Sequence, residues 1–183
     1  MDCTETTLRR EDIYSGRIIT VHRDTVALPD GRESLREIVE HPGGVTVLPL
    51  DADGTVWCVR QFRYAYGEML LELPAGKLED GEDPLKCAKR ELGEETGFTA
   101  DEYLSLGALW PSPGYCRETI YLYLARSLHA GRQHLDEGEF LNVERHTLDE
   151  LVAMAMDGSL RDAKTVAAVL KAKRLLEGEE KAK

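Results

Sequence analysis

Residues 76–98 read GKLEDGEDPLKCAKRELGEETGF, and this stretch determines how the rest of the chain is interpreted. It carries three glutamates, Glu91, Glu94 and Glu95, at spacings i, i+3 and i+4. On a helix these side chains emerge from neighbouring positions, where like charges repel one another. A divalent cation reverses that balance, because hard ions such as Mg²⁺ prefer carboxylate oxygens together with water and substrate phosphates. The spacing therefore predicts a metal site built on a helix.

Local signals limit this helix to about residues 84–96. Asp83 is a good N-cap, and Pro84 follows at the first helical position, where its missing N–H is not needed. Gly97 is placed to end the helix in a left-handed turn. Apolar residues also recur at helical spacing and predict a core-facing stripe made of Leu85, Ala88 and Leu92. The acidic row and the apolar stripe therefore lie on different faces of one helix.

The same stretch resembles the Nudix box, a loop–helix–loop signature. Its specified positions are filled by Gly76, Glu82, Arg90-Glu91-Leu92, Glu94-Glu95, Gly97 and Phe98. A solvated acidic helix face is the competing interpretation, and the complete pattern disfavours it. Within the box, Glu82 and Arg90 are expected to pair and hold the loop against the helix.

The resemblance implies an α+β protein with the Nudix fold, which is an α/β/α sandwich with a mixed β-sheet. It also implies hydrolysis of a nucleoside diphosphate linked to another group. Glu91 and Glu95 are then the central metal ligands, and Glu94 contributes to the metal shell and to catalysis. The Ala75 carbonyl completes the shell, and the implied cofactor is Mg²⁺, with Mn²⁺ as an alternative.

Length and composition indicate one globular domain with a small appended element. The chain has 183 residues, of which 42% are hydrophobic and 31% charged. A net charge of −11 argues against nucleic acid and anionic membranes as partners. The polar N-terminus lacks a signal-peptide core, no stretch is long enough to span a membrane, and the four cysteines lack zinc or redox spacing. We therefore expect a cytoplasmic enzyme.

Hydrophobic patterns divide the rest of the chain into a β-rich module at residues 1–42, a main domain at residues 43–176 and a frayed tail at residues 177–183. A hairpin with its turn at residues 29–31 is expected in the first module. In the main domain, strands are expected near residues 45–50, 57–62, 69–73, 103–110, 119–125 and 140–146. Helical spacing resumes after residue 148, which fits helices packed on a mixed sheet.

A downstream segment resembles the ADP-ribose pyrophosphatases within the Nudix family. Pro113 lies fifteen residues after Phe98, where these enzymes carry a marker proline, and Glu118 fits the same pattern. An ordinary turn is the alternative interpretation. The resemblance therefore implies that Pro113 and Glu118 lie near the substrate.

Three further residues are candidates for substrate binding. Arg63 resembles a family arginine that meets the phosphate or terminal ribose, and its guanidinium offers a two-donor fork for oxyanions. Arg36 occupies a similarly recurring position upstream, and Glu72 precedes the metal-site loop and is expected to face the site.

Residues 135–140, LDEGEF, resemble the acidic loop that supplies the catalytic base in this subfamily. By position Glu137 is the first candidate for the base and Glu139 the second. A mobile loop can bring such a carboxylate in when substrate and metal are bound. A solvated acidic loop is the alternative.

Together these features predict Mg²⁺-dependent hydrolysis of ADP-ribose to AMP and ribose 5-phosphate. Another nucleoside diphosphate sugar, or an oxidised nucleotide, is the alternative substrate. A non-catalytic nucleotide-sugar sensor is a third possibility, which the complete box and the lack of a basic helix disfavour. The N-terminal module also resembles the one through which these enzymes form homodimers.

Overall fold

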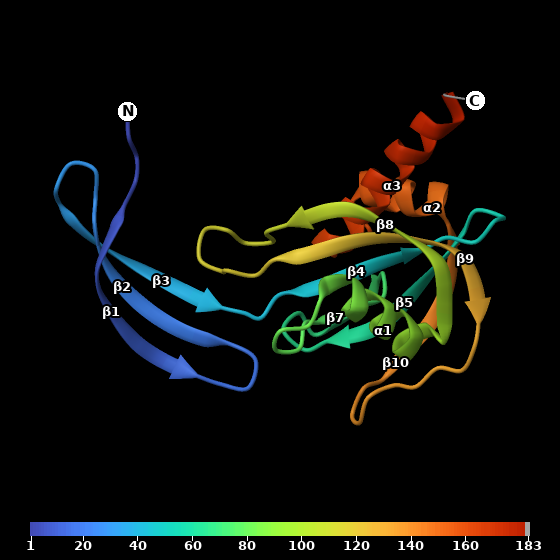
Figure 1. Ribbon diagram of the computed structural model, residues 1–183, viewed down its shortest axis with the longest axis horizontal. Helices are drawn as coiled ribbons and strands as arrows, with labels where there is room; N and C mark the ends of the chain where they lie inside the picture. Colours follow the sequence, from blue (N-terminus) through green and yellow to red (C-terminus); the bar gives the residue numbers. More distant parts are fainter. Residues whose placement is uncertain (182–183) are drawn as a thin grey trace. The chain divides into compact units, whose positions relative to one another are not determined.

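The computed structural model describes residues 1–181, which form two compact units. The first unit comprises Met1–Gly43 together with Trp110–Thr119, and the second comprises Gly44–Leu109 together with the chain from Ile120 onward. Figure 1 shows the course of the chain through both units. Residues 110–119, expected in the main domain, group with the N-terminal strands in the structure.

The first unit is a three-stranded antiparallel sheet in the order β1-β2-β3. Its strands are β1 (Thr6–Ser15), β2 (Thr20–Ala27) and β3 (Glu33–Glu40). The expected hairpin is β2–β3, and Gly31 in its turn has φ of +84°. The segment 110–119 runs beside β3, because Val39 N–H donates to the Tyr115 carbonyl at 2.8 Å and Arg117 N–H donates to the Val39 carbonyl at 2.9 Å.

The second unit contains a mixed sheet and a smaller antiparallel sheet. The mixed sheet has the order β7-β4-β9-β8, with β4 parallel to β9 and the other neighbours antiparallel. Its strands are β4 (Gly44–Pro49), β7 (Ala75–Lys77), β8 (Phe98–Leu109) and β9 (Ile120–Ala130). The antiparallel sheet, in the order β10-β5-β6, is formed by β5 (Thr55–Arg63), β6 (Glu68–Glu72) and β10 (Leu141–Thr147).

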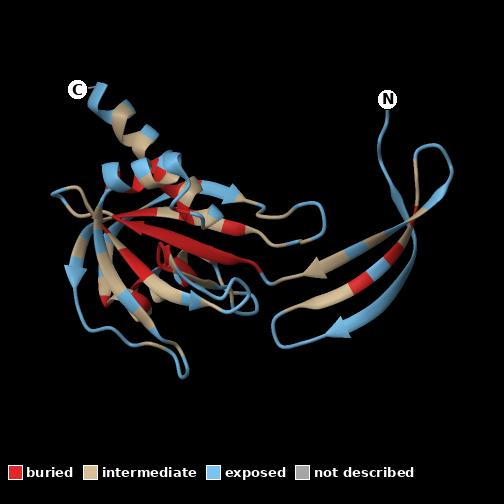
Figure 2. Cartoon of the chain, turned by 180° about the vertical axis from the view of Figure 1, so that it is seen from behind, coloured by how far each residue is buried: buried red, intermediate tan, exposed pale blue. Residues whose placement is uncertain are grey.

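Helices cover both faces of the mixed sheet. They are α1 (Pro84–Thr96), α2 (Leu148–Asp157) and α3 (Ala163–Lys181). Strand β4 is buried along its whole length (Figure 2) and alternates between two hydrophobic clusters. Val45 and Val47 pack with Leu92 of α1, whereas Leu48 packs with Leu151 of α2 and Val169 of α3. The predicted α/β/α sandwich is therefore confirmed.

The C-terminal helix is longer than the sequence analysis expected. Helix α3 continues to Lys181, so residues 177–181 of the expected frayed tail are helical, and residues 182–183 lie outside the described part of the chain. Arg126 of β9 donates to both carboxylate oxygens of Glu179, at 3.0 and 3.1 Å, which ties this last part of α3 to the sheet. Within residues 1–181, no helix is both long enough and apolar enough to cross a membrane.

Candidate functional site

Helix α1 begins and ends where its local sequence predicts. The Asp83 carboxylate accepts hydrogen bonds from the N–H groups of Leu85 and Lys86, both at 3.1 Å, which is the geometry of an N-cap. At the other end Gly97 has φ of +77°, and its N–H donates to the Gly93 carbonyl at 2.9 Å. These caps fix the two ends of the helix, and the packing of Ala88 and Leu92 against β4 turns the acidic row away from that cluster.

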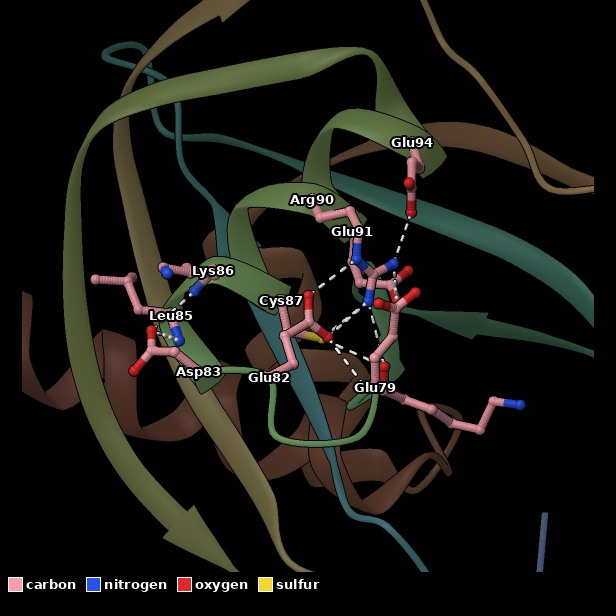
Figure 3. A network of polar contacts seen from close by, with 10 residues as sticks. Glu79, Glu82, Asp83, Leu85, Lys86, Cys87, Arg90, Glu91 and Glu94 are labelled. Atoms are coloured by element: carbon pink, nitrogen blue, oxygen red, sulfur yellow. Dashed lines mark hydrogen bonds and ion pairs between the residues drawn. The ribbon is translucent and has the colours of Figure 1, made fainter.

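Arg90 lies at the centre of the acidic row (Figure 3). Its Nε and Nη2 donate to the two oxygens of Glu82 at 3.1 and 3.0 Å, which confirms the expected pair. Its Nη1 donates to Glu91 Oε1 and to Glu94 Oε2, both at 2.8 Å. The hydrogen bond from Arg90 lowers the pKa of Glu82 to about 2. One guanidinium therefore offsets the repulsion that the glutamate spacing creates.

Glu95 is the buried carboxylate of the row, and Glu91 is partly buried, with 12% of its side chain exposed. Glu95 is 1% exposed, and one of its oxygens accepts the N–H of Ala75 at 2.9 Å. Burial raises the pKa of Glu95 to about 8, and the charges of Glu91 and Glu139 add to the rise, while the Ala75 hydrogen bond and Lys164 oppose it. Burial likewise raises the pKa of Glu91 to about 7. Both groups therefore resist ionisation near neutral pH in the absence of a cation.

Gly76 gives Glu91 the space that it occupies. A Cβ on Gly76 would lie 1.9 Å from both Cδ and Oε1 of Glu91, so any larger residue would force the carboxylate out of this position. Strand β7, which contains Gly76, is held by pairing with β4. The glycine of the box is therefore required by close packing and not by a left-handed backbone.

The donor set fits a hard divalent cation. Oxygen ligands from Glu91 and Glu95 are those that Mg²⁺ and Mn²⁺ prefer, and their raised pKa values show that positive charge would stabilise them. Within residues 1–181, no three His, Cys, Asp or Glu side chains already converge as a complete ligand group. Glu94 instead contacts Arg90, and Glu95 contacts the Ala75 main chain.

A buried ion cluster lies next to Glu95. Arg63 donates from Nε and Nη2 to the two oxygens of Glu72, each at 2.6 Å, and Lys164 Nζ donates to Glu72 Oε2 at 2.6 Å. Glu72 has no exposed surface and contacts Arg63 through both carboxylate oxygens, so it does not line the site directly. Burial alone would raise the pKa of Glu72, but Arg63 and Lys164 together hold it below its ordinary value.

The loop with the two candidate bases is anchored on the C-terminal end of α1. The Gln133 side chain donates to the Glu95 carbonyl at 2.6 Å, and His134 N–H donates to the Glu94 carbonyl at 3.0 Å. Further along this loop Glu137 is exposed, whereas Glu139 is half-buried and its charge raises the pKa values of the helix glutamates. The loop therefore directs Glu139 toward the acidic row.

The remaining substrate-binding candidates belong to the first unit. Arg36 Nε donates to Glu5 at 2.9 Å, and Glu118 Oε1 lies 3.4 Å from His41 Nδ1. Pro113 is exposed in the turn between Ser112 and Tyr115. The second unit thus brings together the metal-ligand candidates, Arg63, Glu72 and Glu139, and the first unit carries Arg36, Pro113 and Glu118.

Two positions in the second unit were missed by sequence reasoning. Lys164 and Gln133 contact Glu72 and the Glu95 main chain, respectively. Nothing in the sequence near Lys164 points to a partner 92 positions earlier.

Comparison with known families agrees with this site. The NUDIX domain matches residues 40–169, which include α1, Arg63 and the acidic loop. This chain belongs to the Nudix family. Residues 5–39 match a second family, the nucleoside diphosphate sugar hydrolase N-terminal domain. The complete box lies within the NUDIX match, and the protein is a Nudix hydrolase.

Individual relatives cover nearly the whole of this Nudix hydrolase. An ADP-ribose pyrophosphatase of Bacillus subtilis (strain 168) is 41% identical over 167 residues, with 90% of each chain covered. A methanol dehydrogenase activator of Bacillus methanolicus has the same identity and coverage. A crystal structure of an ADP compounds hydrolase, 24% identical, superimposes with a TM-score of 0.85 over 96% of this chain and 95% of that one, which confirms the fold.

Proposed function

We propose that this Nudix hydrolase cleaves the diphosphate of ADP-ribose and releases AMP and ribose 5-phosphate. The observation that carries the proposal is the pair of shielded carboxylates on α1, buried Glu95 and partly buried Glu91, together with the guanidinium of Arg63, which interacts electrostatically with Glu95. A diphosphate is a concentrated negative charge, so its hydrolysis needs cations near the phosphates and an acceptor for the proton of water. The Bacillus subtilis relative supports ADP-ribose as the substrate.

Glu91, Glu95 and the Ala75 carbonyl would hold the divalent cation, Mg²⁺ or Mn²⁺, and Glu94 would complete its shell. Such an ion, when bound, neutralises phosphate charge and lowers the pKa of water. Gly76 leaves the Glu91 carboxylate its space, and the Ala75 N–H orients Glu95 through a 2.9 Å hydrogen bond. These contacts keep the donors in place before substrate arrives.

Glu139 is the proposed base that accepts the proton of the attacking water. Its partial burial and its electrostatic effect on Glu91 and Glu95 support this role over Glu137, which is exposed. Sequence position alone ranked the two glutamates in the opposite order. Glu137 therefore stays the alternative base.

Arg63 is proposed to bind a phosphate of the substrate, with Glu72 acting only through Arg63. Arg36, Pro113 and Glu118 of the first unit are proposed to contact the nucleoside or the terminal ribose. The first unit also exposes several apolar side chains, which support its proposed role in forming a homodimer: Leu8, Ile13, Tyr14, Ile18 and Leu35. Sedimentation analysis that finds only monomer at micromolar concentration would refute this assembly.

An assay of substrates tests the reaction. The protein is incubated with Mg²⁺ or Mn²⁺ and with ADP-ribose, GDP-mannose, UDP-glucose and an oxidised nucleotide, and products are separated by anion exchange. ADP-ribose should be hydrolysed fastest, giving AMP and ribose 5-phosphate, and a Glu95→Gln control should release neither product. Faster cleavage of another compound would replace ADP-ribose as substrate. Tight binding without product in any reaction would instead support a sensor.

A further inference from the structure

Glu72 is a buried carboxylate that always needs a cation. It has no exposed surface, and each of its oxygens accepts at least one charged hydrogen bond at 2.6 Å. Leaving such a charge without a partner is strongly destabilising, because the low-dielectric interior does not solvate it. For Glu72 to stay ionised, at least one of Arg63 and Lys164 must therefore remain in contact with it.

The two cations differ in how firmly they are held. The Arg63 side chain is 40% exposed, whereas the Lys164 side chain is 11% exposed. Arg63 is the last residue of β5, and Lys164 lies in the first turn of α3. Lys164 also lies 2.9 Å from Asp162, which accepts the N–H of Thr165 at the start of the same helix. Lys164 is therefore fixed by the helix, while Arg63 has access to solvent.

The first turn of α3 is also bonded to the chain that follows Glu72. The Leu73 N–H donates to Thr165 Oγ1 at 2.9 Å, and the Pro74 carbonyl accepts the N–H of Val47 at 2.9 Å. The next residue after Pro74 is Ala75, whose N–H donates to the Glu95 carboxylate. Lys164 thus lies in the helical turn whose hydrogen bond holds Leu73, at the start of the segment that leads into the metal site.

We propose that Lys164 is a positioning residue that keeps Glu72 neutralised while Arg63 exchanges its contact with Glu72 for the diphosphate of the substrate. The inference rests on the proposed function, in which Arg63 binds a phosphate. When Arg63 moves, Glu72 keeps Lys164 as its cationic partner through a 2.6 Å hydrogen bond, although Lys164 also lies 2.9 Å from Asp162. Without Lys164, Arg63 is retained by Glu72, because its departure would leave the buried carboxylate unpaired.

A double-mutant cycle between Lys164 and Glu72 tests this role. Lys164→Met should raise KM for the best substrate roughly tenfold or more with a smaller change in kcat, since a tenfold change corresponds to one lost ionic contact. Lys164→Arg should restore KM to near the wild-type value. In a Glu72→Gln background, Lys164→Met should change KM by less than about twofold, because no buried charge then retains Arg63.

Lys173→Met is the matched control, because Lys173 lies on the same helix and pairs with the exposed Asp149 at 2.7 Å. It should leave KM unchanged. If Lys164→Met fails to fold, Lys164→Gln takes its place, since it keeps a donor and loses the charge. A fall in melting temperature and kcat with KM unchanged would overturn the proposal and make Lys164 merely structural. An equal rise in KM in both backgrounds would also overturn it.

The same four proteins are titrated calorimetrically with inorganic pyrophosphate in the presence of Mg²⁺. Pyrophosphate contains the diphosphate without a nucleoside or a sugar. Pyrophosphate should bind Lys164→Met about tenfold more weakly than wild type, and equally in the two Glu72→Gln proteins. Unchanged affinity in Lys164→Met would overturn the exchange of Arg63. This readout does not depend on ADP-ribose, so a wild-type protein that ignores ADP-ribose refutes the proposed substrate alone.

Discussion

Replacing Glu95 with glutamine removes a buried charge and keeps the shape of the side chain. Glu95 is 1% exposed and accepts the Ala75 N–H at 2.9 Å, a bond that a glutamine oxygen also accepts. Burial raises the pKa of Glu95 to about 8, so its ionised form is disfavoured when no cation is bound. We expect Glu95→Gln to be hydrolytically inactive, yet more stable than wild type in alkaline, metal-free buffer.

The sign of the pH effect follows from proton binding. A carboxyl whose pKa rises from 4.5 in the unfolded chain to about 8 in the folded protein binds more protons when folded between those values. Its contribution to stability is therefore complete below pH 4.5 and is lost as the pH rises through 8. At 1.36 kcal/mol per pKa unit, the full loss is about 4 to 5 kcal/mol.

Thermal unfolding in EDTA at pH 5, 7 and 9 measures this loss. For a protein of this size about 2–4 °C of melting temperature corresponds to 1 kcal/mol, so the variant should exceed wild type by roughly 10 °C at pH 9 and match it at pH 5. Mg²⁺ should raise the melting temperature of wild type at pH 9 and have little effect on the variant. Turnover should fall on the order of a thousandfold.

Glu94→Gln is the matched control, because Glu94 is partly exposed and bonds to Arg90 at 2.8 Å. It should show no gain in stability at pH 9. A Glu95→Gln protein that melts at or below the wild-type temperature at pH 9 would refute the argument that ionised Glu95 destabilises the metal-free fold.

Four further substitutions probe the rest of the site. Gly76→Ala should reduce turnover at least roughly a hundredfold with an unchanged circular dichroism spectrum, because the new Cβ would lie 1.9 Å from the Glu91 carboxylate. Glu139→Gln should lower kcat about a hundredfold with little change in KM, and Glu137→Gln much less; the reverse order would make Glu137 the base. Arg90→Ala removes the hydrogen bonds to Glu82, Glu91 and Glu94 and should lower the free energy of unfolding by about 2 kcal/mol in urea titrations. The loss is moderate because the guanidinium is partly exposed, and an unchanged unfolding midpoint would show that Arg90 does not stabilise the acidic row.

Helix α1 is predictable because its determinants are local. Asp83 caps the first turn within three residues, and Gly97 terminates the last turn through its own left-handed backbone. Glu82 and Arg90 are eight residues apart and complement each other in charge, so their pair is also legible from sequence. Signals of this kind act over distances shorter than the helix itself.

Strand β1 shows the opposite case. All ten residues of Thr6–Ser15 are exposed, so the strand has no buried face and therefore no apolar alternation in its sequence. Its pairing with β2 is carried by main-chain hydrogen bonds and by exposed ion pairs such as Arg23–Glu11 at 2.7 Å. The end of α3 was missed for a related reason, because Glu179 is held by Arg126, 53 residues earlier.

In the candidate site, too, residues with local signals were predictable and residues placed by tertiary contacts were not. Sequence identifies the carboxylates through the repulsion that their spacing implies, but the groups that compensate a buried charge are chosen by tertiary contact. Arg63 illustrates the consequence: its sequence context indicates a phosphate ligand, whereas in the structure its Nε and Nη2 donate to Glu72. The two assignments are compatible only if Glu72 has a second cation, and Lys164 supplies one at 2.6 Å. Lys164, which no local pattern in the sequence singles out, is thus needed if Arg63 is to bind a phosphate of the substrate.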